Sequence, residues 1–520
     1  MSGLRNLFGD VRKPHPIRGA KVTTAQYDPD EDLKTFGYSQ QLRRSMGGYS
    51  SFALAFSMIS ITTCIFTLFG QPFQMIGGVA IWLWVLATAG IVVIAAVYGH
   101  LAARLPVTGY AYQWSSRIVN RDYGWFSGWT ALLSFFVGTA SIAVAMASVF
   151  APEIWTTPTH GDIALFAAIA IVAAVAVNIV SIRAATMFNN VGASAELIGT
   201  LGLTVVVAIG LFFFSHKQGP GILVQTGSST GGPVNLTTIG LALLLPVYTL
   251  LGWEGSADLA EETRDPRKVA PTAMFRSVII SGIAAFFVYA IFAMAIPGSI
   301  AATANGTQNA MIAVFQAHFG SGLALLLKII AFVAIFSALL ANVTVATRMC
   351  FSLSRDKMLP GWQVLSRVND RTRTPIYSIL LVGLVALVVN LLSAGIITRV
   401  VAIVAVTYYG TYVFTMVATL IGAKRGTIPD AGPQYFNLGR WLRPLAWIGI
   451  AWSAIVMLYM TVPAVNHVAG EYTVYFEILG VLWFFLYLRR RIRSGEAGPP
   501  LAALPSGEAA DEMKITKESM

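Results

Sequence analysis

The stretch at residues 241–258, LALLLPVYTLLGWEGSAD, decides the fold of this chain. Its first half is apolar, but Gly252 and Gly255 bracket a Trp-Glu pair and a second acid follows at Asp258. Glycine costs about 1 kcal/mol relative to alanine in a helix interior, so Gly-Trp-Glu-Gly predicts a break in a helix. Lipid tolerates non-helical backbone only where it lines a cavity inside the protein. The stretch therefore predicts a broken membrane helix beside a cavity.

The composition of the whole chain supports a membrane setting. Of the 520 residues, 56% are hydrophobic and only 11% are charged, whereas soluble domains average about 25% charged residues. Uncharged runs such as Ile81–Val97 recur along the chain, and one spanning helix needs roughly 20 apolar residues. We therefore expect an all-α membrane protein of about twelve spanning helices. Their approximate bounds are 48–70, 76–99, 124–150, 162–182, 188–214, 237–260, 273–296, 326–350, 376–394, 398–421, 444–465 and 471–489.

The basic residues predict the orientation of the helices. Although the net charge is +11, these residues flank apolar segments, so nucleic acid is not an expected partner. They gather in the even-numbered connections, such as Arg264, Arg267 and Lys268 in the sixth. The positive-inside rule then places both termini in the cytoplasm. We expect a multi-pass protein of the cell membrane with polar tails at 1–45 and 492–520, the second of them disordered. The first tail lacks the apolar core of a cleavable signal peptide.

The first spanning segment is the expected partner of the broken sixth one. Small polar residues that can satisfy freed backbone groups gather near its centre, namely Ser60, Thr62, Thr63 and Cys64. The first and sixth segments each open a set of five helices, and an odd number gives the two sets opposite topology, as in an inverted repeat. This predicts a first repeat at about 48–214, a second at about 237–421 and two extra helices at about 444–489.

Acids and aromatic residues in these segments are candidates for the chemistry of the pathway, because charge within a membrane is costly and usually functional. Glu254 either exchanges a proton or attracts an ammonium group near the pathway, or it locks the bundle through a hydrogen bond. The same alternatives apply to Asp258, and a structural hydrogen bond is favoured for Glu196. Tyr248 and Trp253 either cover a bound solute with their rings or pack the bundle.

Three motifs then indicate a family. They are YGHLAARLPVTGYAYQW at 98–114, GWEGSADLAEETRDPRK at 252–268 with Pro271, and TRMCFSLSRDKMLP at 347–360, followed by Asn369 and Thr374-Pro375. With these motifs in order at helix ends, the chain from about Tyr38 to Tyr487 resembles the amino acid–polyamine–organocation transporters, and among them the amino acid/choline permeases.

The resemblance implies a central site between broken helices 1 and 6, flanked by helices 3 and 8. It implies that the 261–268 stretch is a cytoplasmic helix end where Glu261, Glu262 and Arg264 help to close an inner gate; the alternative is a solvated loop. The substrate-binding residues that it implies are Ser60, Thr62, Thr63, Cys64, Tyr248, Leu251, Gly252, Trp253 and Glu254.

Some positions depart from the family pattern. Many relatives carry glycines where this chain has Thr62, Thr63 and Cys64, which suggests a smaller or differently shaped pocket. Many also carry glutamate where His100 stands. Residues 188–214 contain no lysine, so the lysine-based coupling of some proton-linked relatives is not expected.

The expected function is therefore transport of an amino acid or related amine, such as γ-aminobutyrate, choline or a polyamine, by alternating access. The substrate carboxylate would bind free N–H groups at the start of the second half of helix 1. The membrane-embedded acids favour proton coupling, and sodium-coupled symport or exchange is the alternative. Neither a cofactor nor a metal is expected, because the six histidines are scattered. A membrane-bound enzyme would need a nucleophile or metal-ligand pattern, and a channel would need charged rings or a filter loop; the sequence has neither.

Overall fold

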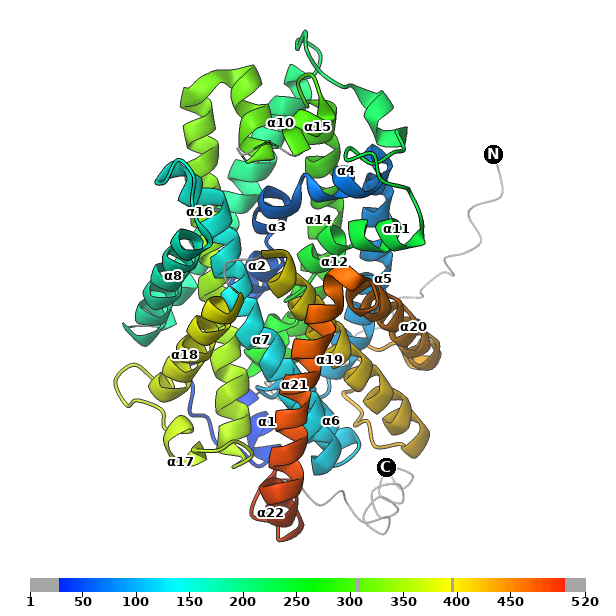
Figure 1. The fold of residues 1–520 in the computed structure, drawn as a ribbon. Coiled ribbons are helices and arrows are strands. Elements are labelled where there is room, and N and C mark those ends of the chain that lie inside the picture. Colours follow the sequence, from blue (N-terminus) through cyan, green and yellow to red (C-terminus); the bar gives the residue numbers. More distant parts are fainter. Residues whose placement is uncertain (1–27, 181, 305, 307–308, 394–396, 501–520) are drawn as a thin grey trace, which may run out of the picture.

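The computed structural model describes residues 28–180, 182–304, 306, 309–393 and 397–500. In this part of the chain the only β pairing is an isolated parallel bridge between Met46 and Thr263. The rest is a bundle of helices packed side by side (Figure 1). The first half contains α1 (Pro29–Thr35), α2 (Gly48–Ile59), α3 (Ile61–Leu68), α4 (Gln71–Met75), α5 (Trp82–Ala102), α6 (Tyr110–Ile118), α7 (Arg121–Phe150), α8 (His160–Val180), α9 (Ile182–Ser194), the π-helical turn η3 (Ala195–Thr200) and α10 (Leu201–Gly210).

The second half is equally helical. It contains α11 (Leu236–Ala242), α12 (Leu244–Thr249), α13 (Gly255–Asp258), the 3-10 turn η5 (Ala260–Glu262), α14 (Pro266–Met294), α15 (Ile300–Ala304), α16 (Ala310–Arg355), α17 (Trp362–Leu365), α18 (Ile376–Ser393), α19 (Ile397–Arg425), α20 (Leu442–Thr461), α21 (His467–Trp483) and α22 (Arg489–Arg493).

The expectation of an all-α membrane protein is confirmed. Eleven helices among the described residues are long and apolar enough to cross a membrane. The sixth predicted span is not one of them, because it is divided into α11, α12 and α13 and its apolar part, Leu236–Thr249, is short. The total of twelve spans, the inverted repeat with its bounds and the cytoplasmic location of both termini stay predictions.

The first span is broken at Ser60. Its φ of 39° and ψ of 77° are left-handed, and they separate α2 from α3. A serine can hold this conformation because its side chain compensates: Ser60 Oγ accepts a hydrogen bond from the Thr63 N–H at 3.3 Å and so caps α3. The break therefore lies at the first of the four small polar residues, slightly before the centre of the group.

The predicted interruption of the sixth span is confirmed at residues 250–254, where no helix is formed. Gly252 has a φ of 88°, and a Cβ atom there would lie 2.9 Å from Met58 Cβ. A Cβ on Gly255 would lie 2.6 Å from Met58 Sδ. Glycine is therefore needed at both positions to let the last turn of α2 approach the break. The two interruptions face each other across this contact.

One end of the bundle gathers α1, α6, α17 and α22 (Figure 1). Residues 28–46 belong to the folded bundle there instead of forming a tail up to residue 45. They are held by an ion pair of 2.7 Å between Asp32 and Arg267 and by the bridge from Met46 to Thr263. Residues up to 500 also pack at this end, because Gly498 N–H donates to the Asp356 carbonyl at 2.8 Å. The remainder of both predicted tails, 1–27 and 501–520, lies outside the described residues.

The opposite end of the bundle carries a short helix at 310–319, the first part of α16. Gly320, with a φ of 77°, separates this helix from the rest of α16, and Asn309 caps its start. Asn309 also donates from Nδ2 to the Phe66 carbonyl at 2.7 Å. The short helix is therefore attached directly to the second half of the broken first span.

Candidate functional site

A cavity of about 30 Å³ lies between the two helix breaks. This volume holds one or two water molecules. Six of the nine substrate-binding residues that the sequence indicated line it: Ser60, Thr63, Cys64, Tyr248, Leu251 and Gly252. The lining also includes Met58 and Ile59 of α2, Gly138 and Ile142 of α7, Asn342 of α16, and Val404 and Tyr408 of α19. Together these thirteen residues define the central cavity.

The remaining three candidates lie behind this lining. Trp253 is fully buried, with its ring 5.1 Å from that of Tyr98 and 5.7 Å from that of Tyr412. Glu254 is also fully buried and accepts a hydrogen bond from the Tyr412 hydroxyl at 3.2 Å. Thr62 turns toward η3. Trp253 and Glu254 thus hold the sixth-span break against neighbouring helices, and the hydrogen bond of Glu254 to Tyr412 is of the kind expected in the second alternative stated for it.

The polar groups around the central cavity are neutral. The Tyr248 hydroxyl lies 2.7 Å from Ser141 Oγ. Asn342 Nδ2 donates to Thr139 Oγ1 at 2.7 Å and to the Phe135 carbonyl at 2.9 Å. No residue of the lining is an acid, a lysine, an arginine or a histidine. The cavity can therefore offer hydrogen bonds and helix-end dipoles to a ligand, but no compensating formal charge.

The start of α3 is only partly open to a ligand. Glu196 Oε1 accepts a hydrogen bond from the Thr62 N–H at 2.7 Å, and Ser60 Oγ caps Thr63. In the described part of the chain the Ile61 N–H is left without a protein acceptor. Glu196 comes from η3, and π-helical turns are frequent at functional sites. The expected hydrogen bond of Glu196 is thus directed at the interrupted helix itself.

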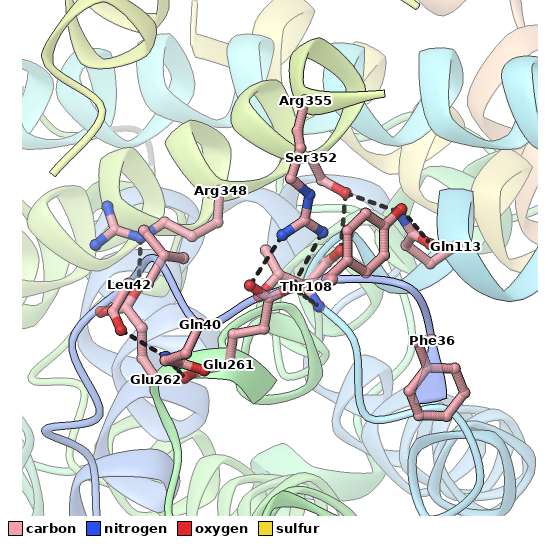
Figure 2. Close-up of polar contacts among 12 residues, drawn as sticks. Phe36, Gln40, Leu42, Thr108, Gln113, Glu261, Glu262, Arg348, Ser352 and Arg355 are labelled. Atoms are coloured by element: carbon pink, nitrogen blue, oxygen red, sulfur yellow. Dashed lines mark hydrogen bonds and ion pairs between the residues drawn. The ribbon is translucent and has the colours of Figure 1, made fainter. Parts of the chain in front are cut away.

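Two buried ion pairs follow the sixth-span break in the sequence (Figure 2). Glu261 accepts two bonds of 3.0 Å from the guanidinium of Arg355. Glu262 accepts one of 2.6 Å from Arg348, and both side chains are 1% exposed. Both arginines project from α16, and both acids follow α13. The pairs therefore attach the sixth span to α16, and burial makes each of them sensitive to the loss of one partner.

Asp356 adds a third group to these pairs. Its carboxylate accepts hydrogen bonds from the Tyr38 hydroxyl at 2.8 Å, from Tyr112 at 2.9 Å and from Gln113 Nε2 at 2.9 Å. Burial and the nearby Asp356 carboxylate raise the pKa of Tyr38 above its ordinary value, so its hydroxyl stays a neutral donor. Arg355 lies 3.7 Å from the centre of the Tyr38 ring. We call Glu261, Glu262, Arg348, Arg355 and Asp356 the polar cluster.

The loop before α6 joins the same region. Asp258 Oδ1 accepts from the Gly109 N–H at 2.7 Å, and Glu261 Oε1 accepts from the Thr108 N–H at 3.3 Å. Gly109 has a φ of 95°, and a Cβ there would collide with Ser352. Of the predicted gating candidates, Arg264 is not brought into the polar cluster: its residue is exposed, and its backbone N–H donates to Met46.

A family model described as amino acid permease matches residues 46–485. The chain belongs to the amino acid permease family. Similar proteins are the amino-acid permease BAT1 of Arabidopsis thaliana (25% identical, over 84% of this chain and 89% of the relative) and the BAT1 homolog of Oryza sativa subsp. japonica (27%, 83% and 87%). The low-affinity putrescine importer PlaP of Escherichia coli strain K12 is 25% identical over 76% of this chain and 88% of the relative.

The permease is therefore a multi-pass membrane transporter of amino acids or amines, and not an enzyme. The resemblance stated from the three motifs is confirmed by this match.

Proposed function

We propose that this permease carries a small zwitterionic amino acid by alternating access through the central cavity, and that protons drive it. The observation that carries the proposal is the pair of facing breaks around an uncharged cavity. A zwitterion needs a partly positive and a partly negative partner but no net countercharge. Broken helices supply both, as free N–H groups on one side and free carbonyls on the other.

In this proposal the start of α3 receives the substrate carboxylate. α3 has eight residues, and its N-terminus carries a partial positive charge and the unpaired Ile61 N–H. The ammonium group meets carbonyl oxygens freed in residues 250–254. Tyr248, Ile142 and Val404 then surround the side chain of the substrate. Because the cavity is smaller than any amino acid, the half-helices must separate for binding, so a small side chain is favoured.

The lining argues against a polyamine as the main substrate. A dication such as putrescine would place two charges in a buried site that has no acid, and burying an unpaired charge is costly. Glu254 is the nearest acid in sequence to the lining, but it is engaged with Tyr412 behind Trp253. The putrescine specificity that the PlaP name states is therefore not transferred to this chain.

Glu196 is the proposed proton carrier. As a carboxylate it accepts the Thr62 N–H at the positive end of α3, and a proton on that oxygen would remove the acceptor. Its neighbours there are hydroxyl groups, with Thr62 Oγ1 2.9 Å from Thr200 Oγ1. The position of α3 and the protonation of Glu196 are thus linked through one hydrogen bond. Glu254 and Asp258, which also accept hydrogen bonds at the sixth span, are secondary candidates for the same role.

The polar cluster serves as the inner gate in this proposal. Its two ion pairs and the Asp356 hydrogen bonds join η5, α16 and residues 28–46 in one closed arrangement. Opening the inner side requires these contacts to separate and become hydrated. Binding of substrate and proton can shift the permease between the two forms only if their contacts differ between them.

Uptake into liposomes tests the proposal. Purified permease is reconstituted, and radiolabelled alanine, lysine and putrescine are supplied under imposed pH or sodium gradients. We expect alanine uptake driven by an inward proton gradient, with little uptake of putrescine. Absence of uptake of every amino acid and amine under every gradient would refute the transport proposal for this cavity. Faster putrescine uptake would refute the zwitterion assignment, and dependence on sodium alone would favour sodium symport.

A pair of variants separates the proton carrier from other acids. Glu196→Gln is expected to abolish accumulation driven by the pH gradient while retaining exchange of alanine across the membrane. Glu477→Gln is the matched control, because Glu477 also lies in a spanning helix but accepts its hydrogen bond from Thr130, away from both breaks. Equal loss of pH-driven accumulation in both variants would remove the special role of Glu196.

A further inference from the structure

A second and larger cavity lies between α2 and α14, and none of its residues belongs to the central cavity. Its volume is about 530 Å³. It is lined by Gly48, Tyr49, Phe52, Lys268, Val269, Thr272, Ala273, Arg276 and Ile280. We call it the α2–α14 groove. Its floor is mostly apolar, and two of its lining residues are cations.

The groove opens toward the lipid side of α14. Ile280, Ile283 and Phe287 are exposed by 39%, 54% and 55%. Together with Arg276 they follow the spacing i, i+4, i+7 and i+11, which places all four on one face of a helix. Arg276 lies about 15 Å along the helix from Pro266, at about 1.5 Å per residue. It therefore stands where an apolar, lipid-facing stripe meets the charged end of the bundle.

The positive charges of the groove, on Arg276 and Lys268, are only weakly neutralised by acidic groups of the protein. Arg276 is exposed, and no ion pair or hydrogen bond of its guanidinium occurs among the described residues. Lys268 has a long contact of 3.6 Å with Asp265, in which the two side chains are 56% and 36% exposed, and its ammonium group lies 5.8 Å from the centre of the Tyr435 ring. Exposed pairs of this kind contribute little. The groove thus has a net positive edge above an apolar floor.

We propose that the α2–α14 groove binds an anionic phospholipid, with the phosphate between Arg276 and Lys268 and an acyl chain along Phe52 and Ile280. A guanidinium offers a fork of donors that matches phosphate geometry. Basic pockets between spanning helices are suited to acidic headgroups. A free phosphate ion would use the cations but leave the apolar floor exposed, whereas a lipid uses both.

The position of the groove gives the lipid a consequence for the permease. Tyr49 and Phe52 lie on α2, the first half of the broken first span, while both cations lie on α14. Tyr49 also contacts Ser194 of α9 through a hydroxyl pair 2.6 Å apart. A lipid that touches α2 and α14 together holds them in the arrangement seen here, in which the polar cluster is closed. It therefore favours this form over one in which α2 has moved away. The binding itself does not rest on the proposed transport function, although its effect on transport does.

Thermal unfolding of the full-length permease in detergent tests the binding. Phosphatidylglycerol is added as mixed micelles, with phosphatidylcholine as the neutral lipid and glycerol 3-phosphate as the soluble phosphate. We expect phosphatidylglycerol to raise the melting temperature and the other two to leave it unchanged, since a ligand of the folded form stabilises it by mass action. An equal rise with glycerol 3-phosphate would overturn the lipid assignment, as would an equal rise with phosphatidylcholine.

Variants locate the lipid. The double variant Lys268→Gln/Arg276→Gln is expected to lose at least half of the rise caused by phosphatidylglycerol. Arg440→Gln is the matched control, because Arg440 is also an exposed cation beside an aromatic ring at a helix end, and it should keep the full rise. An unchanged rise in the double variant would overturn the proposal. If that variant does not fold, the single variant Arg276→Gln is studied by native mass spectrometry. Phosphatidylglycerol bound at the wild-type level would then overturn the proposal.

Discussion

Replacing Glu262 by glutamine is expected to open the polar cluster. Glu262 and Arg348 form a 2.6 Å ion pair in which each side chain is 1% exposed, so the variant leaves Arg348 buried without its countercharge. Removing one partner of a buried pair costs roughly 3–5 kcal/mol. Because glutamine keeps an acceptor oxygen, we take about 3 kcal/mol, the lower end of that range. In a form where the cluster is hydrated this cost disappears, so the open form should gain roughly 150-fold in population.

The labelling rate of the Cys64 thiol measures the population of the open form. Cys64 lines the central cavity and is 4% exposed, and the chain has one other cysteine, Cys350. The Cys350→Ser variant is used as the background. Membrane vesicles in which the polar-cluster end of the permease faces the outer solution are treated with a thiol reagent. The labelling rate of Cys64 should rise roughly 150-fold in Glu262→Gln, if labelling follows the open population. The control Asp30→Asn breaks an exposed pair with Arg44 and should change the rate less than about fivefold. A folded Glu262→Gln variant that is labelled at nearly the wild-type rate would refute the reasoning.

Two further substitutions test the sixth-span break and the hydrogen bond between Tyr38 and Asp356 of the polar cluster. Gly252→Ala adds a Cβ that lies 2.9 Å from that of Met58, at a φ of 88°, so it should lower stability by about 1–3 kcal/mol and abolish uptake in the liposome assay. Gly202→Ala, at a helical site with open space around it, should leave the melting temperature unchanged or slightly higher; a similar loss at both sites would contradict the steric argument. Tyr38→Phe removes a donor to Asp356 and should weaken the closed form by about 1–3 kcal/mol, measured as faster Cys64 labelling with the ring packing retained. An unchanged rate in that variant would show that the hydroxyl does not hold the cluster closed.

The broken sixth span could be predicted from its sequence because the signal is local. Two glycines around Trp253-Glu254 lower helix propensity at one point in an apolar run. The break in the first span is less visible, since Ser60 adopts a left-handed conformation that serine rarely takes and caps α3 with its own oxygen. Sequence reasoning therefore found the group of polar residues around the break but not the residue at which the helix ends.

The side-chain composition of the cavity was harder to foresee. Asn342 and Tyr408 lie in helices that are buried on several faces, so apolar periodicity does not separate the face toward the pathway from the face toward a neighbouring helix. The same uncertainty in rotation about the helix axis explains why Thr62, in α3, was expected in the lining and lies behind it. Glu254 lies in the non-helical break, where helical periodicity gives no direction for a side chain. Tyr38 could not be assigned, because its partner Asp356 is 318 positions away and nothing local in a polar segment indicates such a contact.

The first and the last described segments of the chain both contact Asp356. The Asp356 carboxylate accepts a hydrogen bond from the Tyr38 hydroxyl, and its backbone carbonyl accepts one from the Gly498 N–H. Arg121 donates to the carbonyl of Pro499, the next residue. Truncations or substitutions within residues 28–46 or 489–500 therefore act close to this carboxylate and not at a remote surface. A version altered in these segments can lose activity with its central cavity intact, so a kinetic comparison between versions of this permease is meaningful only when residues 28–46 and 489–500 are the same in both.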